Sequence, residues 1–280
     1  MANVLLVSKN VPNCETYMKA LATELQLCGH HVTLHENDTY DEGERSTCDA
    51  PSTPLFTKQT APDYVVVGGG DGTVLLTVNR MPIQVPLVGI NFGEVGFLAD
   101  LRPSTAPSFL NLFLEKKDPK INKRMRIRFD VNGTYVGTAL NEAVIITDRP
   151  SKMLKIAVCI DGVRAEEFRA DGLIVSTPTG STAYAMSGGG PIVDPRLEAF
   201  IMVPMAPFIL TNRPHLIQTG RNVNIILVEE KPARLVIDGQ STITLTQTCS
   251  ITIEKSPEPA LFIDAGENFF EKVTKKLRHL

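Results

Sequence analysis

Residues 64–73 read YVVVGGGDGT. Val65, Val66 and Val67 form a continuous run of β-branched side chains, which is typical of a buried strand, and the glycines after them end it in a turn. Three more short apolar runs and one helical pattern lie around this stretch, at residues 3–7, 31–34, 86–90 and, for the helix, about 14–28. Strands that alternate with helices predict an α/β N-terminal domain with a doubly wound, Rossmann-like parallel sheet.

The pattern changes near residue 120. Residues 125–147 read MRIRFDVNGTYVGTALNEAVIIT and alternate in polarity around Asn132-Gly133, a strong signal for a β-hairpin. Further short strands are expected beside the turn pairs Asp161-Gly162 and Asp238-Gly239. These strands predict a β-rich, sandwich-like C-terminal domain. Residues 268–280 are amphipathic and predict a terminal helix.

Composition excludes several classes of protein. The 280 residues carry a net charge of −3 and no long basic run, so we expect no nucleic-acid partner. The longest apolar run, residues 199–210, is too short to span a membrane and contains two prolines, so we expect no membrane association. Five scattered cysteines show no CxxC pairing, which favours a cytoplasmic location over a secreted, disulfide-linked one.

The glycines of residues 68–72 allow a phosphate to approach the backbone closely, and a helix that starts after them would add N–H donors. Asp71 is unexpected in a simple phosphate cradle because like charges repel. An aspartate at this position suits a base that accepts a hydroxyl proton or a ligand that helps to hold a metal ion. The alternative is that Asp71 caps the next helix. The chain contains neither GxxxxGK[ST] nor GxGxxG at this loop, which argues against a P-loop and a dehydrogenase fingerprint.

Two other segments carry candidate binding groups. Residues 177–182 read TPTGST and are followed by Tyr184, so hydroxyl donors, a helix start and an aromatic ring occur together. An ordinary Ser/Thr-rich capped helix start explains the same pattern. Asn141-Glu142 interrupts an apolar stretch and offers both donors and acceptors to a ribose or a base, although such a pair also satisfies neighbouring backbone groups.

Five segments in this order resemble the NAD kinase family: DYVVVGGGDGTVL, PLVGINFGEVGFLAD, NEAVI, RADGLIVSTPTGSTAYAMSGGGPIVDP and IDGQ. The GGDGT loop is also similar to that of lipid kinases and phosphofructokinases, and TPTGSTAY separates the families. The resemblance implies phosphoryl transfer to the 2′-hydroxyl of the adenosine ribose of NAD, giving NADP. It also implies an α/β domain over residues 1–118, a β-rich NAD-binding domain over 119–255, and a C-terminal segment over 256–280 that packs back on the first domain.

The resemblance assigns roles to individual residues. Asp71 is the expected general base, and Gly70, Gly72 and Thr73 lie against the ribose and phosphates. Asn141 and Glu142 resemble a pair that grips a ribose, and Asp171 a carboxylate that contacts the dinucleotide, with Arg169 two residues before it. The remaining expected contacts, to adenine and ribose or at less specific ligand positions, are Thr182, Ala183, Tyr184, Ser187, Lys152 and Gln240. No protein ligand to a metal is assigned.

The resemblance also implies a divalent metal, Mg²⁺, with ATP or polyphosphate as the phosphoryl donor, and a homo-oligomer, dimer or tetramer. Two positions depart from the family pattern: Glu94-Val95 replaces a bulky residue before Leu, and Leu76 stands where some relatives carry a basic side chain. Two alternative functions stay open. One is another GGDGT-type kinase acting on a lipid or sugar, and the other is a non-catalytic NAD-binding regulator.

Overall fold

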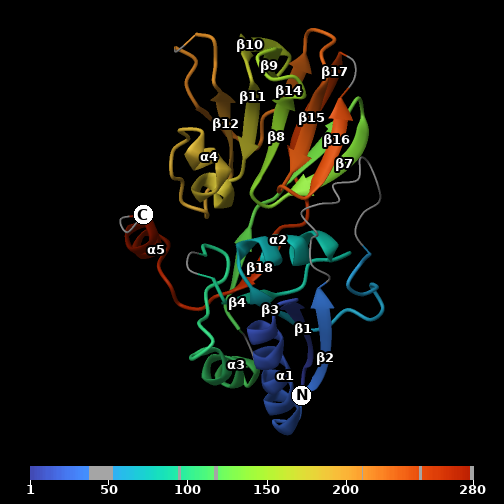
Figure 1. Cartoon of the computed structure of the whole chain (residues 1–280), viewed down its shortest axis with the longest axis vertical. Coiled ribbons are helices and arrows are strands. Elements are labelled where there is room, and N and C mark those ends of the chain that lie inside the picture. The colour runs from blue at the N-terminus through green and yellow to red at the C-terminus, as the bar shows by residue number, and fades with distance from the viewer. Residues whose placement is uncertain (38–52, 94–95, 117–118, 210, 246–247, 278–280) are drawn as a thin grey trace. The chain divides into compact units, whose positions relative to one another are not determined.

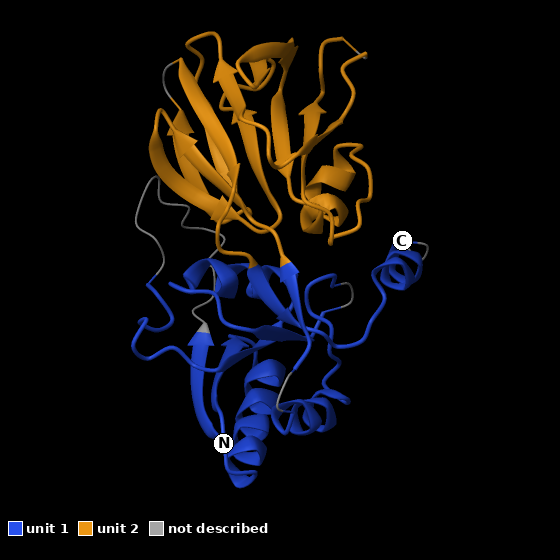
Figure 2. Cartoon of the chain, turned by 180° about the vertical axis from the view of Figure 1, so that it is seen from behind, with its two compact units in different colours: residues 1–46, 50–123, 260–280 blue, residues 47–49, 124–259 orange. Residues whose placement is uncertain are grey.

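The computed structural model describes residues 1–37, 53–93, 96–116, 119–209, 211–245 and 248–277. Chain contacts divide it into two compact units (Figure 2). Unit 1 combines residues 1–46, 50–123 and 260–280, and unit 2 comprises residues 47–49 and 124–259. The expected domain limits at residues 118 and 255 remain a prediction.

Unit 1 contains a six-stranded sheet with strand order β2-β1-β3-β4-β18-β5. The strands are β1 (Asn3–Lys9), β2 (His31–Asn37), β3 (Tyr64–Gly69), β4 (Leu87–Asn91), β5 (Ile121–Arg124) and β18 (Ala260–Ile263). β1 pairs in parallel with β2 and β3, β3 with β4, and β18 with β4. A strand near the end of the sequence thus returns to the N-terminal sheet.

Helices cover both faces of this sheet (Figure 1). They are α1 (Pro12–Leu27), α2 (Asp71–Arg80) and α3 (Ala106–Leu114), and α5 (Phe269–Leu277) follows β18. α1 and α3 pack together on Val88 and Ile90 of β4. A Cβ placed on Gly89, between those two residues, would lie 3.1 Å from Val74 of α2, so α2 covers the opposite face. The predicted doubly wound sheet is confirmed.

α1 has clear start and stop signals. Pro12 stands at its first turn, where a missing N–H costs nothing, and Gly29 follows its end with φ +87°, a conformation that glycine adopts without strain. Its buried side chains recur every three or four residues, which gives the helix one apolar face: Cys14, Met18, Leu21 and Leu25.

Unit 2 consists of two six-stranded sheets in which the paired strands are antiparallel. The first has the order β10 (Val163–Ala170), β9 (Leu154–Ile160), β14 (Val223–Leu227), β17 (Cys249–Lys255), β6 (Ile127–Val131) and β7 (Thr134–Ala139). The second has the order β13 (His215–Gln218), β12 (Ala199–Met205), β11 (Gly172–Ser176), β8 (Glu142–Thr147), β15 (Ala233–Ile237) and β16 (Ser241–Leu245). A short 3₁₀ turn, η1 (Thr179–Thr182), and the one-turn helix α4 (Tyr184–Ser187) follow β11.

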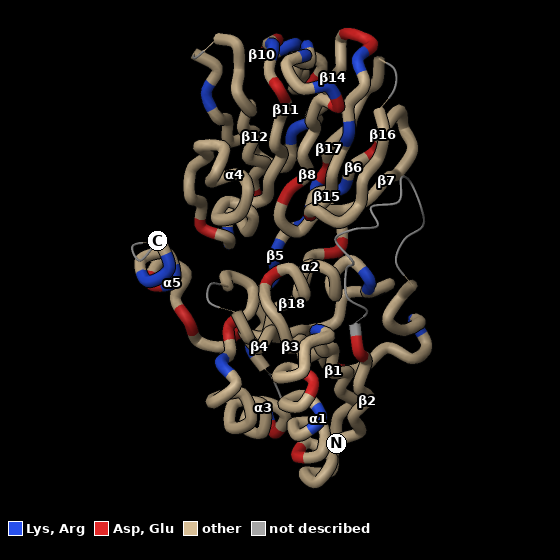
Figure 3. The backbone as a smooth tube through the Cα atoms, viewed as in Figure 1, with Lys and Arg blue, Asp and Glu red and all other residues tan. Residues whose placement is uncertain are grey.

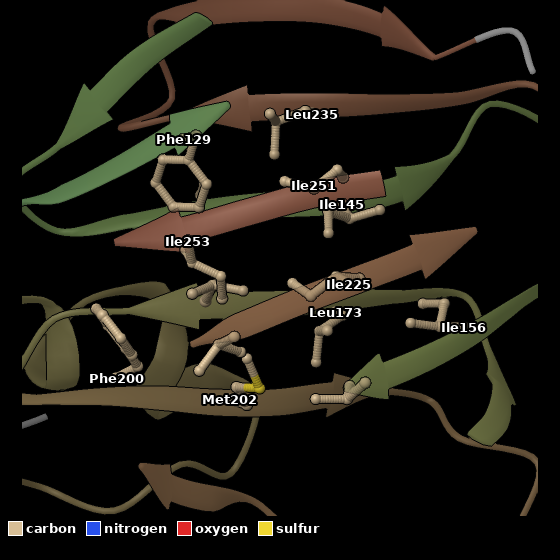
Figure 4. Packing of buried hydrophobic residues seen from close by; sticks show 14 of the residues in the cluster. Phe129, Ile145, Ile156, Leu173, Phe200, Met202, Ile225, Leu235, Ile251 and Ile253 are labelled. Atoms are coloured by element: carbon tan, nitrogen blue, oxygen red, sulfur yellow. The ribbon is translucent and has the colours of Figure 1, made fainter. Parts of the chain in front are cut away.

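The inner faces of the two sheets form one hydrophobic core (Figure 4). Phe129, Ile251 and Ile253 come from the first sheet, and Leu173 and Phe200 from the second. All five are buried because alternate residues of each strand point inward. The predicted β-rich sandwich is therefore confirmed.

The three predicted Asx-Gly turns are also present. Asn132, Asp161 and Asp238 have φ of 49°, 51° and 49°, and the glycine after each also has positive φ. Positive φ at both central residues is the signature of a type I′ hairpin turn. The apolar run from residue 199 forms strand β12, and no helix in the described part of the chain is long and apolar enough to cross a membrane. The predicted terminal helix is α5, and residues 278–280 lie outside the described part.

Candidate active site

The glycine loop lies where the sheet of unit 1 reverses its direction of winding. From β1 the chain enters α1 on one face, and from β3 it enters α2 on the other. β1 and β3 are neighbours in the sheet, so the loops at their carboxyl ends diverge and leave a crevice between them. This topological switch point is the usual ligand site of doubly wound sheets.

The glycine loop is tightly packed at Gly69 and open at the glycines after it. A Cβ on Gly69 would lie 2.3 Å from Oγ1 of Thr73, so only glycine allows the threonine to fold back on the strand end. Gly70 and Gly72 have nothing within 4 Å of an added Cβ, so the space in front of them is open. α2 begins immediately after Gly70; the N–H of Thr73 donates to the Gly70 carbonyl at 3.0 Å, and the N–H groups of Asp71 and Gly72 precede this first bond of the helix. The loop therefore presents backbone donors to an open space, as an anion site does.

The Asp71 carboxylate is held by a second loop. Its Oδ2 accepts a hydrogen bond from the N–H of Phe97 at 2.6 Å, and its Oδ1 accepts from Leu98 and Ala99 at 2.9 and 3.2 Å. A carboxylate offers about four lone-pair sites, so these three bonds leave one on Oδ2. Asp71 is the first residue of α2 and makes no capping bond to it, so the interpretation as a helix cap is wrong.

The two departures from the family pattern differ in outcome. Leu76 is 8% exposed and lies in the hydrophobic interior of unit 1, so this position contributes to packing and carries no charge. Glu94 and Val95 lie outside the described residues.

A second cluster, in unit 2, is built around Asp238. Its carboxylate accepts hydrogen bonds from the N–H groups of Leu140 and Asn141, both at 2.8 Å, and of Glu142 at 3.2 Å. Asp238 is only 6% exposed, so these bonds replace its lost hydration. The Asn141-Glu142 pair is thereby fixed at the start of β8, next to the turn between β15 and β16.

Glu142 is a buried acid with unusual properties. Burial, and secondly repulsion from the Asp238 carboxylate, raise the pKa of Glu142 to about 8, although the N–H of Tyr184 partly opposes this by hydrogen bonding. Its Oε2 is buried without a hydrogen-bond partner among the described residues. At neutral pH the side chain is therefore mostly a neutral carboxylic acid with one O–H donor and an unused acceptor.

The TPTGST segment holds the same corner in place. Thr177 Oγ1 donates to the carbonyl of Leu140 at 2.6 Å and accepts from the N–H of Gly180 at 3.0 Å. A Cβ on Gly180 would lie 2.3 Å from the carbonyl oxygen of Asn141, so this contact also requires glycine. Several hydroxyls of the segment thus bond to the backbone, but η1 and α4 have no side-chain hydrogen bond at their N-caps, so the capped helix start of the simpler interpretation is not present. Tyr184 is 45% exposed, and its ring remains accessible.

The predicted site residues fall into three groups. Gly70, Gly72 and Thr73 lie with Asp71 in unit 1. In unit 2 the structure brings together one end of β8 and the segments around it: Asn141, Glu142, Thr182, Ala183, Tyr184, Ser187 and Gln240, the last being two residues beyond Asp238.

Lys152, Arg169 and Asp171 are not part of that group. Glu142 pairs with Ser176 at one end of the β8–β11 ladder, whereas Asp171 precedes Gly172 at the other end. Five residues of strand separate the ends by roughly 15 Å. Arg169 pairs with Glu229 at 3.4 Å.

Sequence reasoning missed Asp238 and the N–H groups of residues 97–99 as parts of the site. The available signal for Asp238 was the Asp-Gly pair, which predicted a turn and nothing about the carboxylate. Backbone N–H groups leave no signal in a sequence.

Comparison with known proteins identifies the family. The family model of the ATP-NAD kinase N-terminal domain matches residues 4–118, and that of the ATP-NAD kinase C-terminal domain matches residues 140–265. An NAD kinase of Methanospirillum hungatei is 55% identical over 279 residues, which cover 99% of this chain and 100% of the relative. An NAD kinase of Methanoculleus marisnigri is 52% identical, with 99% of each chain covered.

Solved structures agree. An NAD kinase from Archaeoglobus fulgidus in complex with ATP has a TM-score of 0.80 at 30% identity, with 99% of each chain covered. Yeast NADH kinase complexed with NADH has a TM-score of 0.81 at 20% identity, covering 99% of this chain and 87% of that one, which shows a shared fold. The resemblance carried by the five segments is confirmed, and the chain belongs to the NAD kinase family.

Proposed function

We propose that this protein transfers the γ-phosphoryl group of ATP to the 2′-hydroxyl of the adenosine ribose of NAD, giving NADP and ADP. The observation that carries the proposal is family membership over essentially the whole chain. The two residue clusters support it, since one presents backbone donors beside a carboxylate and the other a buried acid beside an exposed aromatic ring.

Asp71 is the proposed general base. A ribose hydroxyl is a weak nucleophile, so a base within hydrogen-bond reach of its proton assists attack on phosphorus. The remaining lone pair of Oδ2 is the acceptor for that proton, while the bonds from residues 97–99 hold the carboxylate still. The 2′-oxygen then bonds to the γ-phosphorus and the bond to the bridging oxygen of ADP breaks. Gly70, Gly72 and Thr73 are proposed to line the phosphates.

The acceptor is proposed to bind at the Asn141-Glu142 corner. A neutral Glu142 donates one hydrogen bond and accepts others, which matches a pair of ribose hydroxyls. The exposed ring of Tyr184 offers a surface on which adenine stacks. Thr182, Ala183, Ser187 and Gln240 are proposed as neighbouring contacts.

Lys152, Arg169 and Asp171 suggest a homo-oligomer. They stand at the opposite end of the β8–β11 ladder from Glu142, so we propose that they contact the dinucleotide bound by another copy of the chain. The edge strands β10 and β13 of unit 2 offer unpaired backbone groups for such an assembly, a dimer or a tetramer.

Mg²⁺ is proposed to arrive with the phosphoryl donor. The described residues contain no group of three or more His, Cys, Asp and Glu side chains that could cage a metal ion. Mg²⁺ in kinases is held largely by substrate phosphates and keeps several waters, so the ion needs few protein ligands and leaves the open lone pair of Asp71 for the hydroxyl proton. The ion would neutralise charge on the phosphates.

We also propose the cytoplasm as the compartment, because the four cysteines in the described part of the chain are all free.

The test is a coupled assay with purified protein, NAD, Mg²⁺ and ATP, in which an NADP-specific dehydrogenase detects the product. Other triphosphates and inorganic polyphosphate replace ATP in parallel reactions. If NADP forms with none of these donors, the proposal is wrong. Phosphorylation of a lipid or sugar would then favour another GGDGT-type kinase, and NAD binding without turnover would favour a regulator.

The base is tested with Asp71→Asn. The amide would place an N–H donor against one of the N–H groups of residues 97–99, so a stability loss of about 1–3 kcal/mol is expected as well. We expect kcat to fall by roughly 10²-fold or more at a temperature where the variant is folded, with the Kd for NAD nearly unchanged. Asp63→Asn is the matched control, because Asp63 also accepts a backbone hydrogen bond, from Asn3 at 2.7 Å. Equal losses in both variants would remove the catalytic role.

A further inference from the structure

The C-terminal helix α5 lines a pocket in unit 1 with three lysines and one glutamate. The pocket has a volume of about 700 Å³ and lies between α5 and the residues that follow β4. Its charged lining groups are four bases, Arg102, Lys272, Lys275 and Lys276, and three acids, Asp100, Glu267 and Glu271, and Figure 3 shows the lysines of α5. Among the described lining residues none is aromatic, so the pocket suits a chain of phosphates better than a nucleobase.

Lys272 anchors this helix. It is 7% exposed, and its ammonium contacts the carboxylate of Asp100 and lies 3.5 Å from Glu267. Lys275 is 76% exposed and lies 3.7 Å from Glu271. The charges of these two lysines are therefore compensated within unit 1.

Lys276 differs from both. In the described part of the chain no carboxylate lies within ion-pair distance of it. It is half-buried, and it stands one turn after Lys272 on the same face, where like charges repel. Burial, and then the charge of Lys272, lower the pKa of Lys276, while Asp71, Asp100 and Glu267 oppose the shift. An anion in the pocket would relieve this uncompensated charge.

Phe97 links Lys276 to Asp71. The Lys276 ammonium lies 5.0 Å from the centre of the Phe97 ring, and the N–H of Phe97 donates to Asp71 Oδ2 at 2.6 Å. A single residue, Phe97, therefore contacts both the Lys276 ammonium and the carboxylate proposed as base. Position 76 of α2 adds no cation, because it is a buried leucine.

We infer that α5 binds the phosphate chain of the phosphoryl donor, with Lys276 as the principal cation. The inference rests on the proposed function and adds the donor side of the site. ATP and inorganic polyphosphate both contain a chain of phosphates, and this shared chain is the group that we place in the pocket.

The experiment compares wild type with Lys276→Ala, Lys276→Arg and Lys19→Ala. Lys19 is a matched control because it is a mid-helix lysine of unit 1, paired with Glu36 at 3.0 Å and not part of the pocket lining. We expect Lys276→Ala to raise the KM for ATP by roughly ten- to a hundredfold, the effect of losing a charge-assisted contact. The KM for NAD changes less than threefold, Lys276→Arg recovers most of the loss, and Lys19→Ala matches wild type.

Calorimetric titration with Mg²⁺-ATP and with tripolyphosphate provides a readout that does not depend on turnover. Both ligands are expected to bind more weakly to Lys276→Ala by the same factor, and the difference is expected to shrink at high salt. The inference is overturned if ATP binding weakens while tripolyphosphate binding does not, if the KM for NAD rises instead, or if nothing changes. Absence of NADP formation by wild type would overturn the proposed function alone, since the titrations still decide the role of α5.

Discussion

Replacing Glu142 by Gln should make the protein more stable at alkaline pH. The native state retains the Glu142 proton up to a pKa of about 8, whereas the unfolded chain releases it near the ordinary value of 4.5. Between these values the folded state binds more protons than the unfolded state, so stability falls as the pH rises. Below pH 4.5 and above pH 8 the contribution no longer changes. Gln cannot ionise and shows no such fall.

The size of the effect follows from the same two pKa values. Each pH unit in the window costs about 1.4 kcal/mol. From about pH 5.5 to about pH 8, wild type should lose on the order of 3 kcal/mol that Glu142→Gln does not lose. The Gln amide also supplies the donor that the protonated carboxyl offers, so the variant should be close to wild type at the acidic end of the range.

Urea unfolding at a series of pH values, followed by circular dichroism because the chain has no tryptophan, measures this difference. Glu198→Gln serves as the control, since Glu198 is a 56% exposed carboxyl of the same unit, paired with Lys255. The control should follow the wild-type pH dependence. Parallel curves for wild type and Glu142→Gln across the window would show that Glu142 ionises at an ordinary pKa and would refute the argument.

Other substitutions test the same architecture. Asp238→Asn turns part of an acceptor for the N–H groups of residues 140–142 into a donor, so a loss of about 2–3 kcal/mol in urea unfolding and weaker NAD binding are expected; an unchanged Kd for NAD would contradict the positioning role. Gly180→Ala drives a Cβ toward the Asn141 carbonyl oxygen, 2.3 Å away, and should cost about 1–3 kcal/mol and raise the KM for NAD, unlike Gly220→Ala, where the added Cβ meets nothing within 4 Å. Phe129→Ala empties a fully buried position between the sheets and should cost about 3–5 kcal/mol while kcat stays at the wild-type value wherever the variant is folded.

The fold was largely predictable because its patterns are local. Three valines before a glycine run predicted β3, and Asx-Gly pairs predicted hairpin turns with positive φ. β12 shows the limit of such reasoning, because its apolar run, which contains Pro204, was used only to argue against a membrane span and was not predicted as a strand. Pro204 lies beyond the last pair between β12 and β13, Met202 with His215, so that side of the strand needs no N–H there.

The site was predictable residue by residue only where a resemblance or a motif named the residue. Separation in space was not predictable. Asp171 and Glu142 fall at opposite ends of one ladder because β8 and β11 are antiparallel, and that register is a tertiary property. Lys276 was predicted only as part of a terminal helix, and its relation to Phe97 depends on how the C-terminal segment packs on unit 1.

Asp71 and Asp238 are held by the same kind of hydrogen-bonding arrangement but have different proposed roles. Each carboxylate accepts hydrogen bonds from three consecutive N–H groups, of residues 97–99 and 140–142 respectively. Asp238 is 6% exposed and is therefore confined to positioning its neighbours. Asp71 is only partly buried, at the open end of a glycine loop, so its remaining lone pair can meet a substrate. Three N–H bonds to a carboxylate thus fix the backbone of residues 140–142 in unit 2 and orient a proposed base in unit 1. The two roles differ because only the Asp71 carboxylate is accessible to a substrate.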